Sequence, residues 1–442
     1  MAQGAVLGLD IGTRMIKFCE IGIGRQGPEL LSYGVCPTPP EVISTGVIVD
    51  PAELGGTIRD LLSSSGARSR RVHCVVTSLS SLVVKVIPFP RMSDEELPEA
   101  MRWEIERYIP WPPGETIVDY KHIQELDQLP ADLTNMPLLL AAGEESMINA
   151  LVQTLLAAKL EPLSLDVEPL AASRALVDIN ADLGAYNQDF ALVNIGAAST
   201  EVNIIDKGNI VLTRSLTIGG DQLTNAIAEG LGKEFDEAER LKVEAGLILF
   251  DPALYRPALQ QSKADAQPPP PAPSGPPQAP PPILQRAEAI IEEQESGGRK
   301  TPVFDLGGTA APPPPPPIPS VEGAGLARIP TNQSLGDSVG KRIFESMAPE
   351  LAEMVKQIRQ TLDYYNARAT DTGISKVLVF GGTARLPHFD LFLTNELGLT
   401  TELADPFQRI QTSAGEGADP ELKALAPMLT IALGMGIRDM LE

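Results

Sequence analysis

A tight glycine turn between two apolar stretches constrains the fold of this chain more than any other feature. The stretch Leu7–Phe18 runs Leu-Gly-Leu-Asp-Ile-Gly-Thr-Arg-Met-Ile-Lys-Phe. It predicts a strand, a turn and a second strand, with Gly12 at the turn and free to adopt a positive φ. Successive backbone N–H groups at such a turn can form a concave anion site. Thr13 adds a hydroxyl, Lys17 a cation, and Asp10 a carboxylate that can hold a magnesium ion through water.

This stretch alone is equally compatible with a plain structural turn, but the pattern recurs in the second half of the chain. An apolar run at 190–195 leads into Gly196, Ala197, Ala198 and Ser199, and an alternating strand follows. Both units then continue through a glycine-containing turn to a third strand. The repeat predicts two related domains. Their two hairpins can face each other across a cleft and hold a polyphosphate from both sides.

A third glycine motif follows the β-rich apolar run at 376–380. Gly381 and Gly382 lack side chains, so a flat ring can approach the backbone closely, and Thr383 comes next. Together the three motifs resemble the actin-like ATPase superfamily, which includes actin, the Hsp70 chaperones, the sugar kinases and FtsA. The resemblance implies an α/β, ribonuclease H-like fold with two domains that bind ATP and Mg²⁺ in the cleft between them.

The same resemblance implies a set of site residues. The expected ATP-binding residues are Asp10, Gly12, Thr13, Lys17, Gly196, Ala197, Ser199, Gly219, Glu239, Lys242, Gly381, Gly382 and Thr383. Asp10 and Asn194 are the expected magnesium positions, acting through water. Glu168, just before a helix at the presumed hinge, is the candidate for ordering the attacking water.

Asn194 departs from the superfamily pattern, which usually has Asp at this position. The amide keeps an oxygen ligand but lacks the negative charge that helps to hold magnesium and orient water. Phosphoryl transfer depends on positioned charge, whereas many backbone donors share the grip on the nucleotide. We therefore expect ATP binding with weak or no hydrolysis.

Residues 81–162 do not follow the repeated strand pattern, and they carry the most specific resemblance to a known family. Ser93 and Glu96 have capping-box spacing, and the segment 102–112 ends a helix in a corner rich in proline and aromatic residues. A packed core corner and a partner-binding surface are equally compatible with this corner. The segment, together with Asp119-Tyr120 and the runs at 166–169, 362–365 and 405–407, resembles the PilM family of type IV pilus assembly.

The PilM resemblance implies a cytoplasmic protein held at the inner membrane by a partner. That partner is the short cytoplasmic tail of a PilN-like inner-membrane protein, and Trp103, Tyr108 and Trp111 are the candidate groove residues. Pilus motor ATPases and self-association are further options. The formal net charge of −23 argues against nonspecific nucleic-acid binding, which needs a basic footprint. No segment is apolar for long enough to insert directly into a membrane.

The domain organisation follows from these patterns. We expect a first domain core at 1–80 and 163–188, an inserted subdomain at 81–162, a second domain at 189–251 and 331–425, and a closing helix at 426–442. Proline tracts at 252–330 predict a disordered insertion, because such sequence cannot form a core. Pro349 is expected to begin a new helix. Within the closing segment 426–442, the helix itself is expected over 429–440.

Two alternatives remain open. An FtsA-like filament-forming ATPase is disfavoured because a linker and an amphipathic membrane helix usually follow in that family, whereas this sequence stops at Glu442, directly after the closing helix. A sugar kinase is less favoured, since residues 81–162 show no sugar-binding pattern.

Overall fold

A computed structural model describes residues 4–25, 27–44, 46–78, 80–123, 134–183, 188–245, 338–368, 373–412 and 419–441. The predicted proline-rich insertion at 252–330 lies outside these residues. Across the described parts of the chain, no helix is long and apolar enough to cross a membrane.

The first large sheet begins with the predicted hairpin. Strands β1 (Val6–Ile11), β2 (Met15–Gly24) and β3 (Gly27–Pro37) form an antiparallel meander, and β6 (Arg71–Val76) and β10 (Glu161–Val167) run parallel to β1. A short strand from late in the chain, β16 (Gln411–Thr412), adds to the outer edge, so the order is β10-β6-β1-β2-β3-β16. A separate two-stranded ribbon, β4 (Ile43–Ser44) and β5 (Val47–Ile48), precedes the first helix.

The second large sheet repeats this plan. Its strands are β11 (Phe190–Ile195), β12 (Thr200–Asp206), β13 (Asn209–Leu216), β14 (Lys376–Phe380) and β15 (Thr400–Leu403), in the order β13-β12-β11-β14-β15. The first three are antiparallel neighbours, and β14 and β15 continue in parallel. The shared topology confirms the predicted two-domain α/β repeat.

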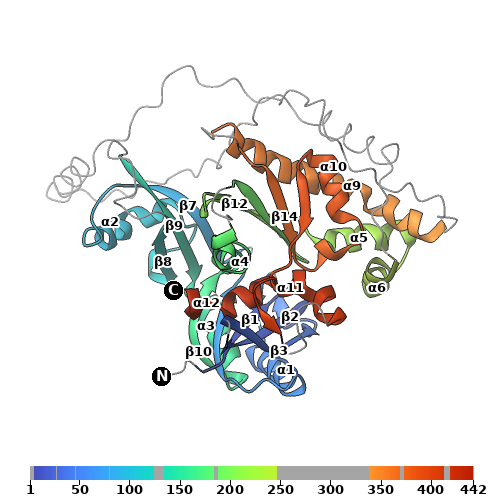
Figure 1. Ribbon diagram of the computed structural model, residues 1–442, viewed down its shortest axis with the longest axis horizontal. Coiled ribbons are helices and arrows are strands. Elements are labelled where there is room, and N and C mark those ends of the chain that lie inside the picture. The colour runs from blue at the N-terminus through green and yellow to red at the C-terminus, as the bar shows by residue number, and fades with distance from the viewer. Residues whose placement is uncertain are drawn as a thin grey trace, which may run out of the picture.

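Helices cover the outer faces of both sheets (Figure 1). On the first sheet, α1 (Pro51–Ser64) begins where the Asp50 carboxylate accepts from two backbone N–H groups, and its buried face packs with α3 (Glu145–Ala157). On the second sheet lie α5 (Gly220–Leu231), α6 (Phe235–Ala245), α9 (Ser338–Asn366) and α10 (Phe389–Leu397). The range 81–162, predicted as one inserted subdomain, therefore has two parts. One part forms a small third sheet, and the other contains α3, which packs on the first large sheet.

The prediction that Pro349 opens a new helix is wrong. Helix α9 runs continuously through it. A proline inside a helix costs roughly 3 kcal/mol because it removes a hydrogen bond and crowds the preceding turn. Here Met347 and Leu351 are fully buried on either side of it, and burying such side chains contributes about 1.5–3 kcal/mol each. Core packing therefore holds the helix together across the proline.

Two helices, α4 (Glu168–Leu176) and α11 (Pro420–Gly436), form a layer between the large sheets and share a core with both (Figure 1). The predicted start of the closing helix at 429 is wrong, because α11 already begins at Pro420, where the Asp419 side chain accepts from the N–H groups of Glu421 and Leu422. The small residues of α11 permit close packing: a Cβ on Gly434 would lie 1.9 Å from the Ala171 carbonyl oxygen of α4. A final short helix, α12 (Arg438–Leu441), follows.

The inserted residues form a third, smaller sheet with strands in the order β7-β9-β8. These are β7 (Leu82–Pro90), β9 (Asn135–Glu144) and β8 (Thr116–His122). Helix α2 (Leu97–Glu104) and the 3-10 turn η1 (Ile105–Arg107) pack on it around a buried apolar cluster, and η2 (Pro113–Glu115) leads into β8. Ser93 donates to the Glu96 carboxylate as the capping-box pattern predicts, yet α2 begins only at Leu97. The remaining 3-10 turns are η3 (Asp178–Leu183) and η5 (Thr383–Arg385).

Candidate nucleotide site

The two predicted glycine turns have the same backbone geometry. The Gly12 N–H donates to the Met15 carbonyl at 3.0 Å, and the Gly196 N–H donates to the Ser199 carbonyl at 2.9 Å. Gly12 does not adopt the expected positive φ. Close approach explains the glycine instead, because a Cβ there would lie 3.1 Å from the Met15 oxygen and 3.3 Å from Lys17 Nζ.

The strand registers make the charged positions of the two hairpins equivalent. Asp10 faces Lys17 across β1 and β2, and Asn194 faces Glu201 across β11 and β12. In the first hairpin the Lys17 ammonium lies 2.6 Å from an Asp10 carboxylate oxygen, and the Asp10 side chain is 9% exposed. Buried charges of this kind need a partner to offset their desolvation. The first hairpin therefore presents a fixed and neutralised ion pair.

The second hairpin is coupled to the hinge helix. The Asn194 side-chain amide donates to Glu168 Oε1 at 2.8 Å, and Glu168 is the first residue of α4. Burial, followed by the negative charge of Glu201, raises the pKa of Glu168 to about 8. Burial also raises the pKa of Glu201 to about 7, against the opposing effect of hydrogen bonds from Ser215 and Ser199. An Asp at position 194 would add a third carboxyl to this cluster, which gives a physical reason for the amide.

The third glycine motif packs directly against the second hairpin. Gly381 has a φ of 94°, and a Cβ there would lie 2.3 Å from Asn194 Oδ1. The Thr383 hydroxyl donates to the Gly196 carbonyl at 2.9 Å. Gly382 differs from its neighbour, because the nearest atom to a Cβ there would be Met428 Cε at 3.8 Å. Gly382 therefore borders open space beside the turn.

Helices α5 and α6 meet the same turn from another side. The N–H groups of Gly220 and Asp221 donate to the carbonyls of Gly196 and Ala197, and a Cβ on Gly219 would lie 2.5 Å from the Ala197 oxygen. The start of α5 thus lies on the second glycine turn.

Lys242 of α6 is buried, and its ammonium donates to Gly220 O at 2.9 Å, Thr224 Oγ1 at 2.7 Å and Glu239 Oε2 at 2.6 Å. Its three donors are used in fixing the start of α5. The Glu239 side chain stays about a third exposed.

One residue of the site was not among the sequence-based candidates. Arg14, in the first glycine turn, forms an ion pair with Asp221 of α5 at 3.1 Å, and its guanidinium lies 4.2 Å from the centre of the Phe235 ring. This pair links the first hairpin to the second domain. Only the position of Arg14 within the turn could have suggested the role, because the pairing joins residues 207 positions apart.

The three aromatic partner candidates have different environments. Trp103 of α2 is 77% exposed. Tyr108 and Trp111 pack against the apolar cluster of the small sheet, and burial raises the pKa of the Tyr108 hydroxyl. The Trp103 ring is therefore open to solvent, whereas Tyr108 and Trp111 are packed into the cluster beneath that surface.

Within the described ranges, no three His, Cys, Asp or Glu side chains converge as a ready-made metal cluster. Magnesium prefers oxygen ligands and usually keeps several waters while it bridges one or two carboxylates and substrate phosphates. Asp10 and the Asn194 amide oxygen are oxygen ligands of the kind this mode uses, and they would hold the ion if it binds here.

Two sheets of the same topology, two helices between them and one glycine turn from each sheet define a protein of the actin-like fold. The model of the family described as type IV pilus assembly protein PilM matches residues 8–249. The chain belongs to the PilM family. The model of cell division protein FtsA also matches residues 191–424.

Similar proteins agree with this fold. The solved PilM-PilN type IV pilus biogenesis complex superposes with a TM-score of 0.70 and 22% identity, covering 98% of both chains. Cell division protein FtsA from Bacillus subtilis is 32% identical over 115 residues, and FtsA from Agrobacterium fabrum is 33% identical over 79 residues. These two matches span 26% and 18% of this chain, and only 25% and 17% of the relatives' own lengths.

Proposed function

We propose that this chain is a cytoplasmic ATP-binding scaffold of type IV pilus assembly that docks on the short tail of a PilN-like inner-membrane protein. The observation that carries the nucleotide half is the pair of equivalent glycine turns, one from each sheet, joined across the domains by Arg14 and Asp221. Membership of the PilM family carries the pilus half.

In this proposal the two turns hold the phosphates from opposite sides. On one side Gly12 leaves room for close approach, Thr13 supplies a hydroxyl and Lys17 a cation, and Gly196, Ala197 and Ser199 act on the other. Gly381, Gly382 and Thr383 cover the adenosine, with Gly219, Glu239 and Lys242 shaping the nucleoside side. Asp10 and Asn194 would hold magnesium through water, and the ion would supply positive charge to the phosphates.

A scaffold rather than a turnover enzyme fits the chemistry of Glu168. Ordering a water for attack needs an ionised carboxylate within reach of that water. The raised pKa keeps Glu168 largely protonated at neutral pH, and its Oε1 is engaged by Asn194. We therefore propose that bound ATP sets the angle between the domains, as in hinge closure.

Tail docking is proposed by analogy with the PilM-PilN complex and by the exposure of Trp103. Exposed aromatic rings are over-represented among interface hot spots. The chain's strong negative charge favours a neutral or basic tail. Through this tail the protein would lie at the inner membrane; pilus motor ATPases and a second copy of the chain are further proposed partners.

Calorimetric titration tests the docking proposal. A synthetic PilN-like tail from the same organism should bind with a Kd of about 1 μM or tighter, equivalent to about −8 kcal/mol. Trp103→Ala should weaken binding without lowering the melting temperature, because the ring is exposed. Val243→Ala, which trims an exposed apolar side chain of α6 in the other domain, is the control. Equal binding by the parent and Trp103→Ala, or equal binding of a scrambled tail, would refute this interface.

The FtsA model match favours a second candidate, an ATP-dependent filament former. Sedimentation with ATP and Mg²⁺ separates the two proposals. A scaffold stays in the supernatant at all protein concentrations, whereas a filament former pellets above a critical concentration.

A further inference from the structure

The outer edge of the first large sheet is covered only in part. Among the residues that the structure describes, strand β16 pairs with β3 at Glu29 and Leu30 alone. Beyond these residues β3 pairs with β2 on its inner side, and no other described strand lies along its outer side. Leu31, at an irregularity in the β2–β3 register, is 46% exposed where this open edge begins. A bare strand edge of this kind is a template for pairing with another chain.

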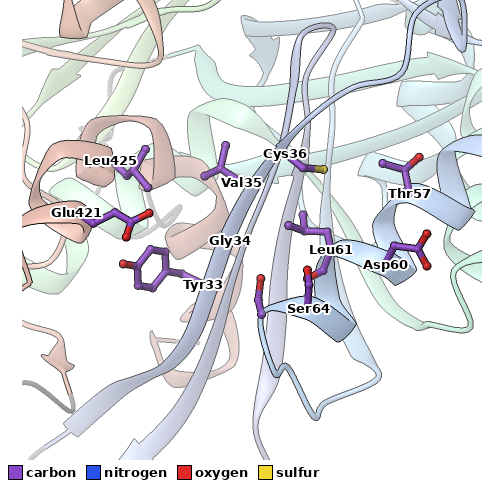
Figure 2. A pocket seen from close by; sticks show the side chains of 11 residues that line it. Tyr33, Gly34, Val35, Cys36, Thr57, Asp60, Leu61, Ser64, Glu421 and Leu425 are labelled. Atoms are coloured by element: carbon purple, nitrogen blue, oxygen red, sulfur yellow. The ribbon is translucent and has the colours of Figure 1, made fainter.

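A groove of about 640 Å³ follows this open edge (Figure 2). Its floor is the β3 backbone from Tyr33 to Cys36, and its walls are α1 and the first turns of α11. Figure 2 shows Tyr33 and Val35 directed toward α11 and Cys36 toward α1, so the groove wraps the strand edge on both faces. An added strand lies about 4.8 Å from its neighbour and would run between the two helices.

Contacts on both faces hold the floor in place. A Cβ on Gly34 would lie 2.6 Å from Phe18 Cε1 and from Ser65 Oγ, so the end of α1 is packed directly on the strand. On the other face, the Tyr33 hydroxyl donates to the Asp419 carboxylate at 2.8 Å, and this contact, together with burial, raises the pKa of Tyr33 to about 12.

The charge of the walls selects the occupant. Asp60 of α1 and Glu421 of α11 line the groove, both are exposed, and neither carboxylate has an ion-pair partner within the described part of the chain. A second copy of this chain would bring the same carboxylates against each other, and like charges placed opposite are destabilising. A basic segment would instead pair with a carboxylate on each side.

We propose that this groove is a second docking site, separate from the small sheet, for an extended basic segment of a partner protein. The segment adds as a strand to the open edge of β3. Its backbone bonds to the β3 edge. On the α11 face its side chains would meet Tyr33, Val35 and the Glu421 carboxylate, and on the α1 face Leu61 and the Asp60 carboxylate, so the segment carries both apolar and basic side chains on each face. This is strand addition, in which backbone bonds give affinity and side-chain pockets give specificity.

Cys36 provides a direct footprint for the test. Cys19 and Cys74 are buried, whereas Cys36 is half-buried and lines the groove. Burial raises the pKa of all three thiols, so only the exposure of Cys36 distinguishes it for labelling. The measurement is the rate at which a thiol reagent labels the full-length protein, with Cys36→Ser giving the baseline. The probe is a ten-residue acetylated peptide that repeats Val-Val-Lys-Lys, which places valine and lysine on both faces of a strand. Its twin of equal charge carries N-methyl groups on all backbone amides, so neither of its edges can donate strand hydrogen bonds.

The peptide should slow labelling of Cys36 about tenfold at ten times its Kd, because about a tenth of the sites then remain free. The twin should leave the rate unchanged. Asp60→Lys combined with Glu421→Lys should raise the Kd roughly tenfold or more, since charge complementarity is reversed. The control, Glu95→Lys combined with Glu234→Lys, makes the same change in net charge at exposed positions outside the groove.

Three results would overturn the proposal. Equal protection by the methylated twin would mean that charge alone attracts the peptide. An equal Kd of the peptide for the two double variants would mean that Asp60 and Glu421 take no part in binding it. Labelling of the free parent protein that is as slow as in Cys36→Ser would mean that the chain itself fills the groove.

Discussion

At the scale of residues, three carboxyl side chains and one amide determine the electrostatics of the site. These are Asp10, Glu168, Glu201 and Asn194. Asp10 is neutralised by Lys17, while Glu168 is held by Asn194 beside Glu201. Asn194 therefore donates to a buried carboxyl whose pKa burial, Glu201 and Asp10 raise and Lys17 lowers. The amide is a requirement of the ligand-free state as well as a difference in metal chemistry.

Asn194→Asp should make the protein's stability depend on magnesium. Two buried carboxyls at hydrogen-bond distance cannot both ionise without cost, so the variant should melt below the parent in chelator. ATP with Mg²⁺ should then raise its melting temperature by more than it raises that of the parent. Differential scanning fluorimetry with and without Mg²⁺ measures both values, and an equal shift in the two proteins would contradict this account.

Glu168→Gln should flatten the dependence of stability on pH. Folding raises the pKa of Glu168 from 4.5 to about 8, so between these values the folded protein keeps a proton that the unfolded chain releases. The free energy of unfolding should therefore fall as pH rises from about 5 to about 8. Gln has no proton to lose but can still accept from Asn194. Urea unfolding at several pH values should show a shallower fall for this variant, with exposed Glu95→Gln behaving as the parent; matching slopes would count against the raised pKa.

At the scale of elements, sequence patterns predicted correctly the hairpins whose formation depends on neighbouring residues. The hairpins at Gly12 and Gly196 follow from the alternation of apolar residues and from turn chemistry. The continuity of α9 through Pro349 and the early start of α11 depend instead on burial against distant segments. The Arg14–Asp221 pair escaped prediction for the same reason, since its partners come from different domains.

Packing of α11 on α4 should be sensitive to a single methyl group. Gly434→Ala would put a Cβ 1.9 Å from the Ala171 carbonyl oxygen unless the helices shift, and overpacking of this kind costs typically about 1–3 kcal/mol. Gly56→Ala in α1 is the matched control, because its Cβ would meet only Arg59 Nη2 at 3.8 Å. That change should instead stabilise by roughly 0.5–1 kcal/mol, as alanine does in helices. Denaturant unfolding of both variants measures these changes in the free energy of unfolding. An unchanged free energy for Gly434→Ala would show that the two helices can move apart without cost.

At the scale of the whole molecule, the long proline-rich stretch should be dispensable for the fold. Deleting residues 266–320 removes sequence whose composition cannot bury a core, and the entropy of loop closure changes slowly with length. The melting temperature and ATP binding should both stay close to those of the parent. A large drop in melting temperature would show that this stretch packs on the domains.

The central claim is that the two domains together hold one nucleotide, and Gly382 offers the sharpest test. Its backbone has an ordinary helical φ of −64°, and the space around a Cβ is open, so Gly382→Leu should fold normally while filling the proposed adenosine position. Isothermal titration of the parent with ATP and Mg²⁺ should give one site with a Kd of about 1 μM or tighter. Gly382→Leu, at an unchanged melting temperature, should show no measurable binding, and Gly56→Leu should bind as the parent does. The absence of binding by the parent, or undiminished binding by Gly382→Leu, would contradict the account.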